Sequence, residues 1–188
     1  MRRSAAAWCS CFLLLGLSAL AVGPVWGNDW PQYRGPDRQG TVPESGLLEA
    51  WEDGQPRIVW RRAIGTGYSA VAAAGGRLFT MDADTEEEAV FALNVETGET
   101  LWRVVVGAFV QAELGDGGPR STPAVDGDVV YAVSTQARLL AMATEDGRLL
   151  WDKDLRELGP VPRFQYSVSP LIDGELLILE VGDRKSVV

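Results

Sequence analysis

The chain has 188 residues and a formal net charge of −9 at pH 7, with 17 basic against 26 acidic side chains. Nucleic acids and anionic membranes bind clustered positive charge, so this balance argues against both as partners. Histidine is absent, which removes the usual general base and the commonest metal ligand.

Residues 1–27 form a predicted signal peptide. Arg2 and Arg3 give it a basic start, an apolar stretch follows at 11–22, and small residues up to Gly27 suit cleavage. Both cysteines of the chain lie inside this segment, so the mature protein has no thiol. We therefore predict a periplasmic or secreted protein with no membrane span after cleavage. An uncleaved anchor is the alternative, although a spanning helix needs about 20 apolar residues.

A Pro/Gly-rich segment, 28–56, follows, and its residue spacing suits neither a helix nor a strand. We call it the strap and expect it to lie over the body of the protein. Residues 57–61 then form a short β-type run that contains Trp60. No other strand precedes this run, so we expect it to be an outermost strand of the domain predicted at 57–188.

Three copies of one strand pair come next, each with a turn between two apolar runs. The turns contain glycine, which supplies the positive φ angles of two-residue hairpins. The pairs span 69–82 around Gly75-Gly76, 121–133 around Asp126-Gly127, and 169–180 around Asp173-Gly174. The turns recur at intervals of 52 and 47 residues.

A third apolar run, a second turn and a tryptophan strand complete each of the first two units. The turns at Gly98 and Gly147 lead to Trp102 and Trp151, which lie 49 residues apart. Four short strands in a meander at this spacing are typical of a propeller blade. The predicted fold is therefore all-β, a β-propeller of four-stranded antiparallel blades.

The cassette A-x-[DN]-x-x-x-G-x-x-x-W carries a family resemblance. It occurs at 92–102 and, with alanine at the third position, at 141–151. Together with the three hairpins it resembles the tryptophan-docking motif of quinoprotein-like (PQQ-repeat) β-propellers. The stretch 30–40 is similar to the strap of many secreted bacterial members. The resemblance covers the chain from about Trp60 onward.

The resemblance implies that the tryptophans pack between adjacent blades, each near the Gly turn of its own repeat, as a large ring with one polar N–H can. The implied docking residues are Trp60, Trp102, Trp151, Gly98 and Gly147. Asn94 and Ala143 stand where the family prefers aspartate. We therefore expect the hydrogen bond to the turn to be weakened in one blade and lost in the other.

The count of strands predicts an incomplete ring with two full blades, one partial blade and an N-terminal closing strand. The chain stops at Val188, just after the second expected strand of the third unit. A propeller needs at least about four blades. We therefore expect a fragment or a truncated reading frame that is poorly stable alone.

The resemblance to quinoprotein dehydrogenases implies a site for PQQ and Ca²⁺ in the central funnel. Such a site would have an Asp base, Glu and Asn ligands to calcium, and often a pair of adjacent cysteines. No catalytic residue, metal ligand or cofactor ligand can be assigned in this chain, so PQQ and calcium would bind only if missing blades supplied the ligands. The acidic segment 82–88 lacks the glycine and regular spacing of a calcium loop. We expect it to be a solvated loop.

The segments that enter the innermost strands are the candidates for ligand contact, because propellers gather binding residues at one rim of the channel. We select Arg120, Tyr68, Tyr166 and Gln165. The guanidinium group of Arg120 offers a planar donor fork to a carboxylate or phosphate. The alternatives are an ion pair of Arg120 with a neighbouring carboxylate and simple packing of the two tyrosines.

The predicted function is a non-catalytic scaffold that binds a protein or peptide at the propeller rim. It would be similar to the propeller subunit of the outer-membrane protein assembly machinery. A fold alone never implies catalysis. The alternative is a fragment of a PQQ- and calcium-dependent dehydrogenase.

Overall fold

A computed structural model describes residues 27–47, 49–51, 54–111, 116–162, 165–181 and 185–187. The predicted signal peptide, apart from Gly27, lies outside these residues. The described residues form β-strands, turns and one 3-10 helix, η1 (Leu155–Glu157), with no α-helix. None of them therefore belongs to a helix long and apolar enough to cross a membrane.

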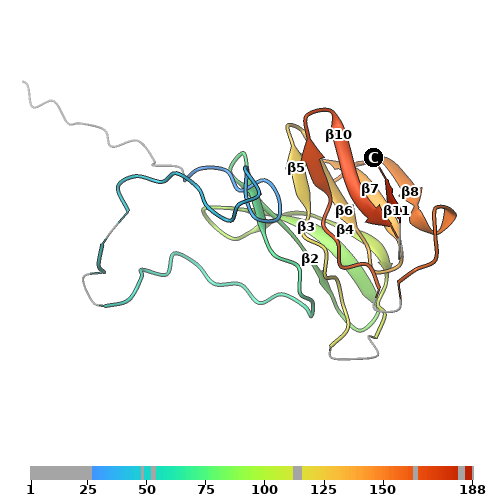
Figure 1. Ribbon diagram of the computed structural model, residues 1–188. Helices are drawn as coiled ribbons and strands as arrows, with labels where there is room; N and C mark the ends of the chain where they lie inside the picture. Colours follow the sequence, from blue (N-terminus) through green and yellow to red (C-terminus); the bar gives the residue numbers. More distant parts are fainter. Residues whose placement is uncertain are drawn as a thin grey trace, which may run out of the picture.

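The strands form three antiparallel sheets in chain order, which confirms the predicted all-β fold with two full blades and one partial blade (Figure 1). The first sheet contains β1 (Ala72–Ala74), β2 (Arg77–Ala83), β3 (Glu87–Asn94) and β4 (Thr100–Ala108). The second contains β5 (Ala124–Asp126), β6 (Val129–Val133), β7 (Arg138–Ala143) and β8 (Leu149–Asp154). The third contains β9 (Leu171–Asp173), β10 (Leu176–Val181) and β11 (Lys185–Val187).

The third sheet has one strand more than the sequence predicted, because β11 pairs with β10. Two of the hairpin turns also begin one residue later than predicted. Asp126 and Asp173 are the last residues of β5 and β9, and each turn starts at the following glycine, with φ of 52° at Gly127 and 58° at Gly174. Ala73, Val125 and Ile172, the middle residues of β1, β5 and β9, are therefore equivalent positions of the three hairpins.

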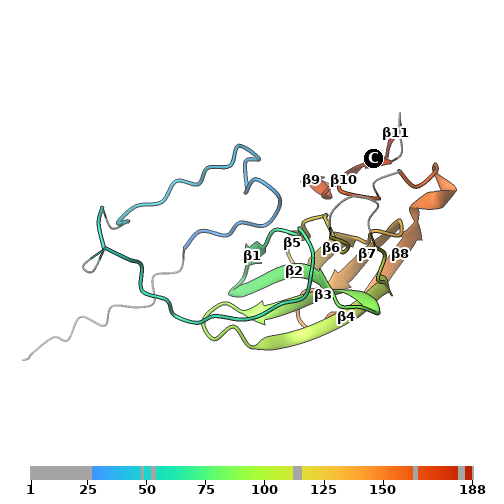
Figure 2. The ribbon, with the colours of Figure 1, turned by 90° about the horizontal axis from the view of Figure 1, so that it is seen from below.

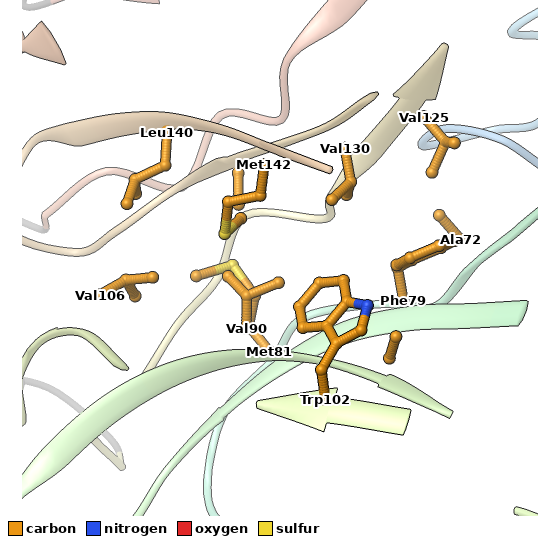
Figure 3. Packing of buried hydrophobic residues seen from close by; sticks show 12 residues of the cluster. Ala72, Phe79, Met81, Val90, Trp102, Val106, Val125, Val130, Leu140 and Met142 are labelled. Atoms are coloured by element: carbon orange, nitrogen blue, oxygen red, sulfur yellow. The ribbon is translucent and has the colours of Figure 1, made fainter. Parts of the chain in front are cut away.

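Apolar side chains from the facing sides of the first two sheets form the main core (Figure 3). Phe79, Met81 and Val90 from the first sheet meet Leu140 and Met142 from the second, and all five are at most 2% exposed. A second cluster, centred on Val133, Leu139, Leu155, Tyr166, Leu179 and Val181, joins the second sheet to the third. The first strands of successive sheets, β1, β5 and β9, lie next to one another.

Two tryptophan rings lie on the Gly turns of the unit that follows them. The indole Nε1 of Trp60 donates to the backbone oxygen of Val95, and that of Trp102 donates to the backbone oxygen of Thr144, both at 2.9 Å. A Cβ on Gly98 would lie 2.6 Å from the Trp60 ring, and one on Gly147 would lie 2.7 Å from the Trp102 ring. The expectation that each ring contacts its own repeat's turn is therefore wrong, since the ring reaches across to the next sheet.

The remaining docking candidate, Trp151, is 44% exposed and rests against Tyr131, with 5.9 Å between the ring centroids. The predicted closing strand at 57–61 is extended but forms no ladder with any described strand. It lies along the first sheet instead, where Trp60 and the guanidinium group of Arg62 hold the turn, the latter donating to Gly98 O at 3.1 Å. An outermost strand needs a pairing partner, and no described strand pairs with residues 57–61.

Asn94 makes the side-chain hydrogen bonds to the turn, with an amide oxygen in place of a carboxylate. Its side-chain oxygen accepts the backbone N–H of Glu96 at 2.8 Å and that of Thr97 at 3.0 Å. Ala143 has no side-chain acceptor, and its turn depends on the backbone bond from Gly147 N to Ala143 O. An amide oxygen therefore replaces a carboxylate in the first unit, while the second unit loses this contact.

Only the middle of the acidic segment 82–88, residues 84–86, is the exposed loop that the sequence suggested, and its two ends lie in strands. Asp82 lies within β2, and Glu88 lies in β3 with its side chain 1% exposed. The Glu88 carboxylate accepts the Thr135 hydroxyl at 2.6 Å and the Thr135 backbone N–H at 3.1 Å. Burial raises the pKa of Glu88, outweighing the hydrogen bonds from Thr135 that lower it. One buried carboxylate therefore links the first sheet to the β6–β7 turn of the second.

We expect the contribution of Glu88 to stability to depend on pH. Because its folded-state pKa is raised, this contribution is fully present below the ordinary value of 4.5 and is lost as pH rises through the folded-state pKa. Glu88→Gln keeps the size and the acceptor oxygen but does not titrate. The free energy of unfolding of the native protein, minus that of Glu88→Gln, should therefore fall between about pH 4 and pH 7.

Urea unfolding at both pH values measures this difference. Glu145→Gln is the matched control, because Glu145 is exposed in the turn before β8, and its difference should change little. A difference for Glu88→Gln that rises with pH would contradict the expected direction of the shift.

Candidate functional site: a cavity at the inner strands

The beginning of the strap crosses the three inner strands at equivalent positions. Trp30 forms two backbone hydrogen bonds with Ala73 of β1, at 2.7 and 2.8 Å. The next strap residue, Pro31, accepts Val125 N of β5 at 2.7 Å, and the side-chain oxygen of Gln32 accepts Ile172 N of β9 at 3.2 Å. One inward-facing N–H from each sheet is therefore satisfied by a successive strap residue. The later part of the strap, by contrast, extends away from the sheets (Figure 2), which corrects the expectation that all of it lies over the body.

The residues that enter the inner strands are also linked from sheet to sheet. Ala70 N donates to Thr122 Oγ1 at 3.3 Å, and Thr122 N donates to Ser169 Oγ at 2.9 Å. These three residues occupy the same position in successive units, since their spacing equals that of the hairpin turns. A repeated contact of backbone to hydroxyl thus sets the spacing of the strand entries.

A cavity of about 660 Å³ opens between the strap and these strand entries. We call it the axial cavity. Its volume is within the usual range of small-ligand sites, about 300–1,000 Å³. The residues that line it are Tyr33, Arg34, Arg38, Tyr68, Ala70, Arg120, Thr122, Ser167, Val168, Ser169, Pro170, Leu171, Ile178 and Glu180.

Arg120 and Tyr68, both selected from the sequence, lie together in this cavity. The guanidinium carbon of Arg120 lies 5.0 Å from the centroid of the Tyr68 ring, a cation–π distance. Its Nη2 donates to the backbone oxygen of Asp116 at 3.4 Å, while its Nε is buried with no hydrogen-bond partner among the described residues. The expected alternative, an ion pair of Arg120 with a carboxylate, does not occur within the described part of the chain.

The strap adds two further arginines to the same cavity. Arg38 forms an ion pair with Asp173 at 3.3 Å, and both side chains are largely exposed. Arg34 makes no ion pair with any described carboxylate. Glu180 is the one acidic residue in the lining. The cavity therefore carries an excess of positive charge in a strongly acidic protein.

The other two selected residues do not contribute to the cavity lining. Tyr166 is 1% exposed and belongs to the second core cluster, where burial raises the pKa of its hydroxyl. Gln165 has a positive φ of 65°, and its side-chain oxygen is buried without a partner among the described residues. The position equivalent to Tyr68 and Arg120 in the third unit is Ser167, one residue further on. Successive residues of an extended chain face opposite sides, so a one-residue slip selected the buried side.

Sequence reasoning missed the strap side of the cavity, Tyr33, Arg34 and Arg38. The available signal was the density of arginine and tyrosine at 33–38, in a segment whose glycines mark a defined turn and not a linker. Gly35 has a φ of 81°, and a Cβ there would lie 2.9 Å from the Trp30 ring. The turn therefore packs on Trp30, and its neighbouring side chains are presented to the cavity.

The calcium ion of a quinoprotein does not fit the residues present. Calcium takes six to eight oxygen ligands, with carboxylates prominent among them. Over the described ranges, no group of three or more His, Cys, Asp or Glu side chains gathers where it could hold a metal. Even with Arg38 paired to Asp173, two further guanidinium groups face the single lining carboxylate of Glu180, which makes the axial cavity unfavourable for a cation.

Repeated antiparallel sheets with their first strands side by side, and with the Trp102 ring between the first two, are the arrangement of a β-propeller. The family model described as "Outer membrane protein assembly factor BamB" matches residues 44–188. The chain belongs to this family. No curated protein matches it.

Several solved structures resemble the chain, each at 16% sequence identity. BamB from Moraxella catarrhalis matches over 64% of this chain and 32% of its own length, with a TM-score of 0.48. A europium-containing methanol dehydrogenase matches over 65% and 22%, with a TM-score of 0.51. A quinohemoprotein alcohol dehydrogenase from Pseudomonas putida matches over 59% and 16%, with a TM-score of 0.43. The chain thus spans a third or less of the length of these proteins, and the methanol dehydrogenase likeness shows the fold alone.

Proposed function

We propose that the protein is an exported, non-catalytic scaffold that binds a protein or peptide partner at the axial cavity. The observation that carries this proposal is the clustering of Arg34, Arg38 and Arg120 around one cavity in a chain whose net charge is −9. An arginine-rich concavity is a recognition surface for polar groups of a partner. The family description, an assembly factor, is consistent with a binding role.

Site-specific photo-crosslinking tests this proposal. A photoreactive phenylalanine derivative at Tyr33, which is 57% exposed in the cavity wall, should form crosslinks to a protein in the native host. The same probe at Leu101, which is 44% exposed on the outermost strand β4, is the control and should form far fewer. The crosslinked protein, once identified by mass spectrometry, should also bind the purified protein. Equal crosslinking at both positions would argue against the cavity as the docking surface.

Reconstitution with PQQ and Ca²⁺ separates the scaffold from a dehydrogenase. We expect neither a shift in the absorbance of the cofactor nor reduction of an electron-accepting dye in the presence of alcohols. Dye reduction that depends on both PQQ and Ca²⁺ would reject the scaffold proposal in favour of the dehydrogenase.

A further inference from the structure

We infer that the axial cavity binds a short acidic peptide segment, whose carboxylates pair with Arg120 and Arg34. This inference rests on the proposed function and names the chemistry of the partner. It follows from the unsatisfied donors of the cavity, its shape and the charge of the surrounding protein.

The guanidinium group of Arg120 has contacts that position it and hydrogen-bond donors that remain unpaired among the described residues. Its guanidinium carbon lies 5.0 Å from the centroid of the Tyr68 ring, in a cavity lined by the strap and the strand entries. Its hydrogen bond to Asp116 O is long at 3.4 Å, and its buried Nε has no partner among the described residues. A planar guanidinium group with a free edge suits a carboxylate, which accepts two parallel hydrogen bonds.

Arg34 provides a second cationic group in the cavity lining, from the strap. Its backbone has a positive φ of 66° and is fixed by the bond from Gly40 N to Arg34 O at 2.8 Å. Arg38 is already paired with Asp173, and this ion pair leaves Arg34 and Arg120 as the groups that gain most from an incoming anion. Such charge-assisted hydrogen bonds are stronger than neutral ones.

The walls favour a peptide over a small inorganic anion or a nucleic acid. The cavity is far larger than a phosphate ion, and the half-exposed rings of Tyr33 and Tyr68 flank the two arginines with flat apolar surface. The hydroxyl group of Ser167 adds a neutral polar contact. A long polyanion would be repelled by the net negative charge of the protein, whereas a segment with one or two carboxylates meets mainly the local positive charge.

Fluorescence anisotropy with two labelled, C-terminally amidated peptides tests the inference. The probe Ala-Glu-Ala-Glu-Ala should bind saturably, and the probe Ala-Gln-Ala-Gln-Ala should not bind detectably. Arg120→Gln and Arg34→Gln should each weaken binding about tenfold or more, the scale of a hydrogen bond to a charged group. Arg148→Gln, in the exposed turn before β8, makes the same change in net charge and should leave affinity unchanged. Circular dichroism checks that each variant is folded.

Equal binding of the two peptides, or unchanged affinity in a folded Arg120→Gln variant, would overturn the inference. Full displacement of the glutamate probe by an equal concentration of inorganic phosphate would assign a small oxyanion instead, and would also overturn it. Crosslinking at Tyr33 distinguishes the two levels of the argument. Crosslinks that persist in Arg120→Gln retain the scaffold function and reject the carboxylate chemistry, whereas no crosslinks at all reject the scaffold function itself.

Discussion

Replacement of Trp102 by alanine is expected to lower the free energy of unfolding by about 3–5 kcal/mol, the usual range for truncation of a large core side chain. The ring is 8% exposed and lies between the first two sheets, 5.9 Å from Phe79 between centroids (Figure 3). Its removal opens a cavity in the main core. It also leaves the backbone oxygen of Thr144 without its indole donor.

Urea unfolding followed by tyrosine and tryptophan fluorescence measures the loss. Trp51→Ala is the matched control, because Trp51 is 50% exposed in the strap, and it should cost no more than about 0.5 kcal/mol, as for surface substitutions. A loss under about 1 kcal/mol for Trp102→Ala would mean that the ring is not buried between the sheets in solution.

Replacement of Gly147 by alanine is expected to cost at least about 2 kcal/mol, through two additive causes. The backbone of Gly147 has a φ of 73°, which an alanine adopts only with strain, and its Cβ would lie 2.7 Å from the Trp102 ring. That ring has no room to withdraw, because its N–H is bonded to Thr144 and its far side packs on the core.

Gly127→Ala separates the two causes. Gly127 has a similar φ of 52°, but a Cβ there would meet nothing within 4 Å, so this variant carries the backbone strain alone, about 1 kcal/mol or slightly more. The excess in Gly147→Ala should disappear when Trp102 is also replaced by alanine, because the clash then has no partner. Equal losses for the two glycine variants would show that the ring does not press on the turn.

The strands and turns could be predicted because their signals are local. Glycine at a hairpin turn reports a positive φ directly, and apolar runs at blade-length intervals report the sheets. Glu88 was misassigned because three consecutive glutamates resemble a hydrated loop. Yet Glu88 alternates with Val90 and Ala92, which are core positions of the same strand. Attention to this period of two would have placed its carboxylate toward the next sheet.

The cavity could be predicted only in part, because it joins segments far apart in the chain. Arg120 and Tyr68 share one position in successive repeats, so the repeat spacing brought them together. The strap has no repeat to align with, and no pattern in the sequence indicates that residues 30–32 meet β1, β5 and β9. Which hydrogen-bond donors an irregular segment satisfies is decided by tertiary contact, which a single sequence does not encode locally.

The path of the strap has a consequence for the order of folding. Gln32 is made early in synthesis, but the N–H that it accepts belongs to Ile172, 140 positions later. The strap must therefore wait for the third hairpin before its last bond can close, and contacts of such long sequence separation are slow to form. Seating of the strap should be among the final folding events, so that the acidic-peptide site is completed only when three successive sheets are already assembled.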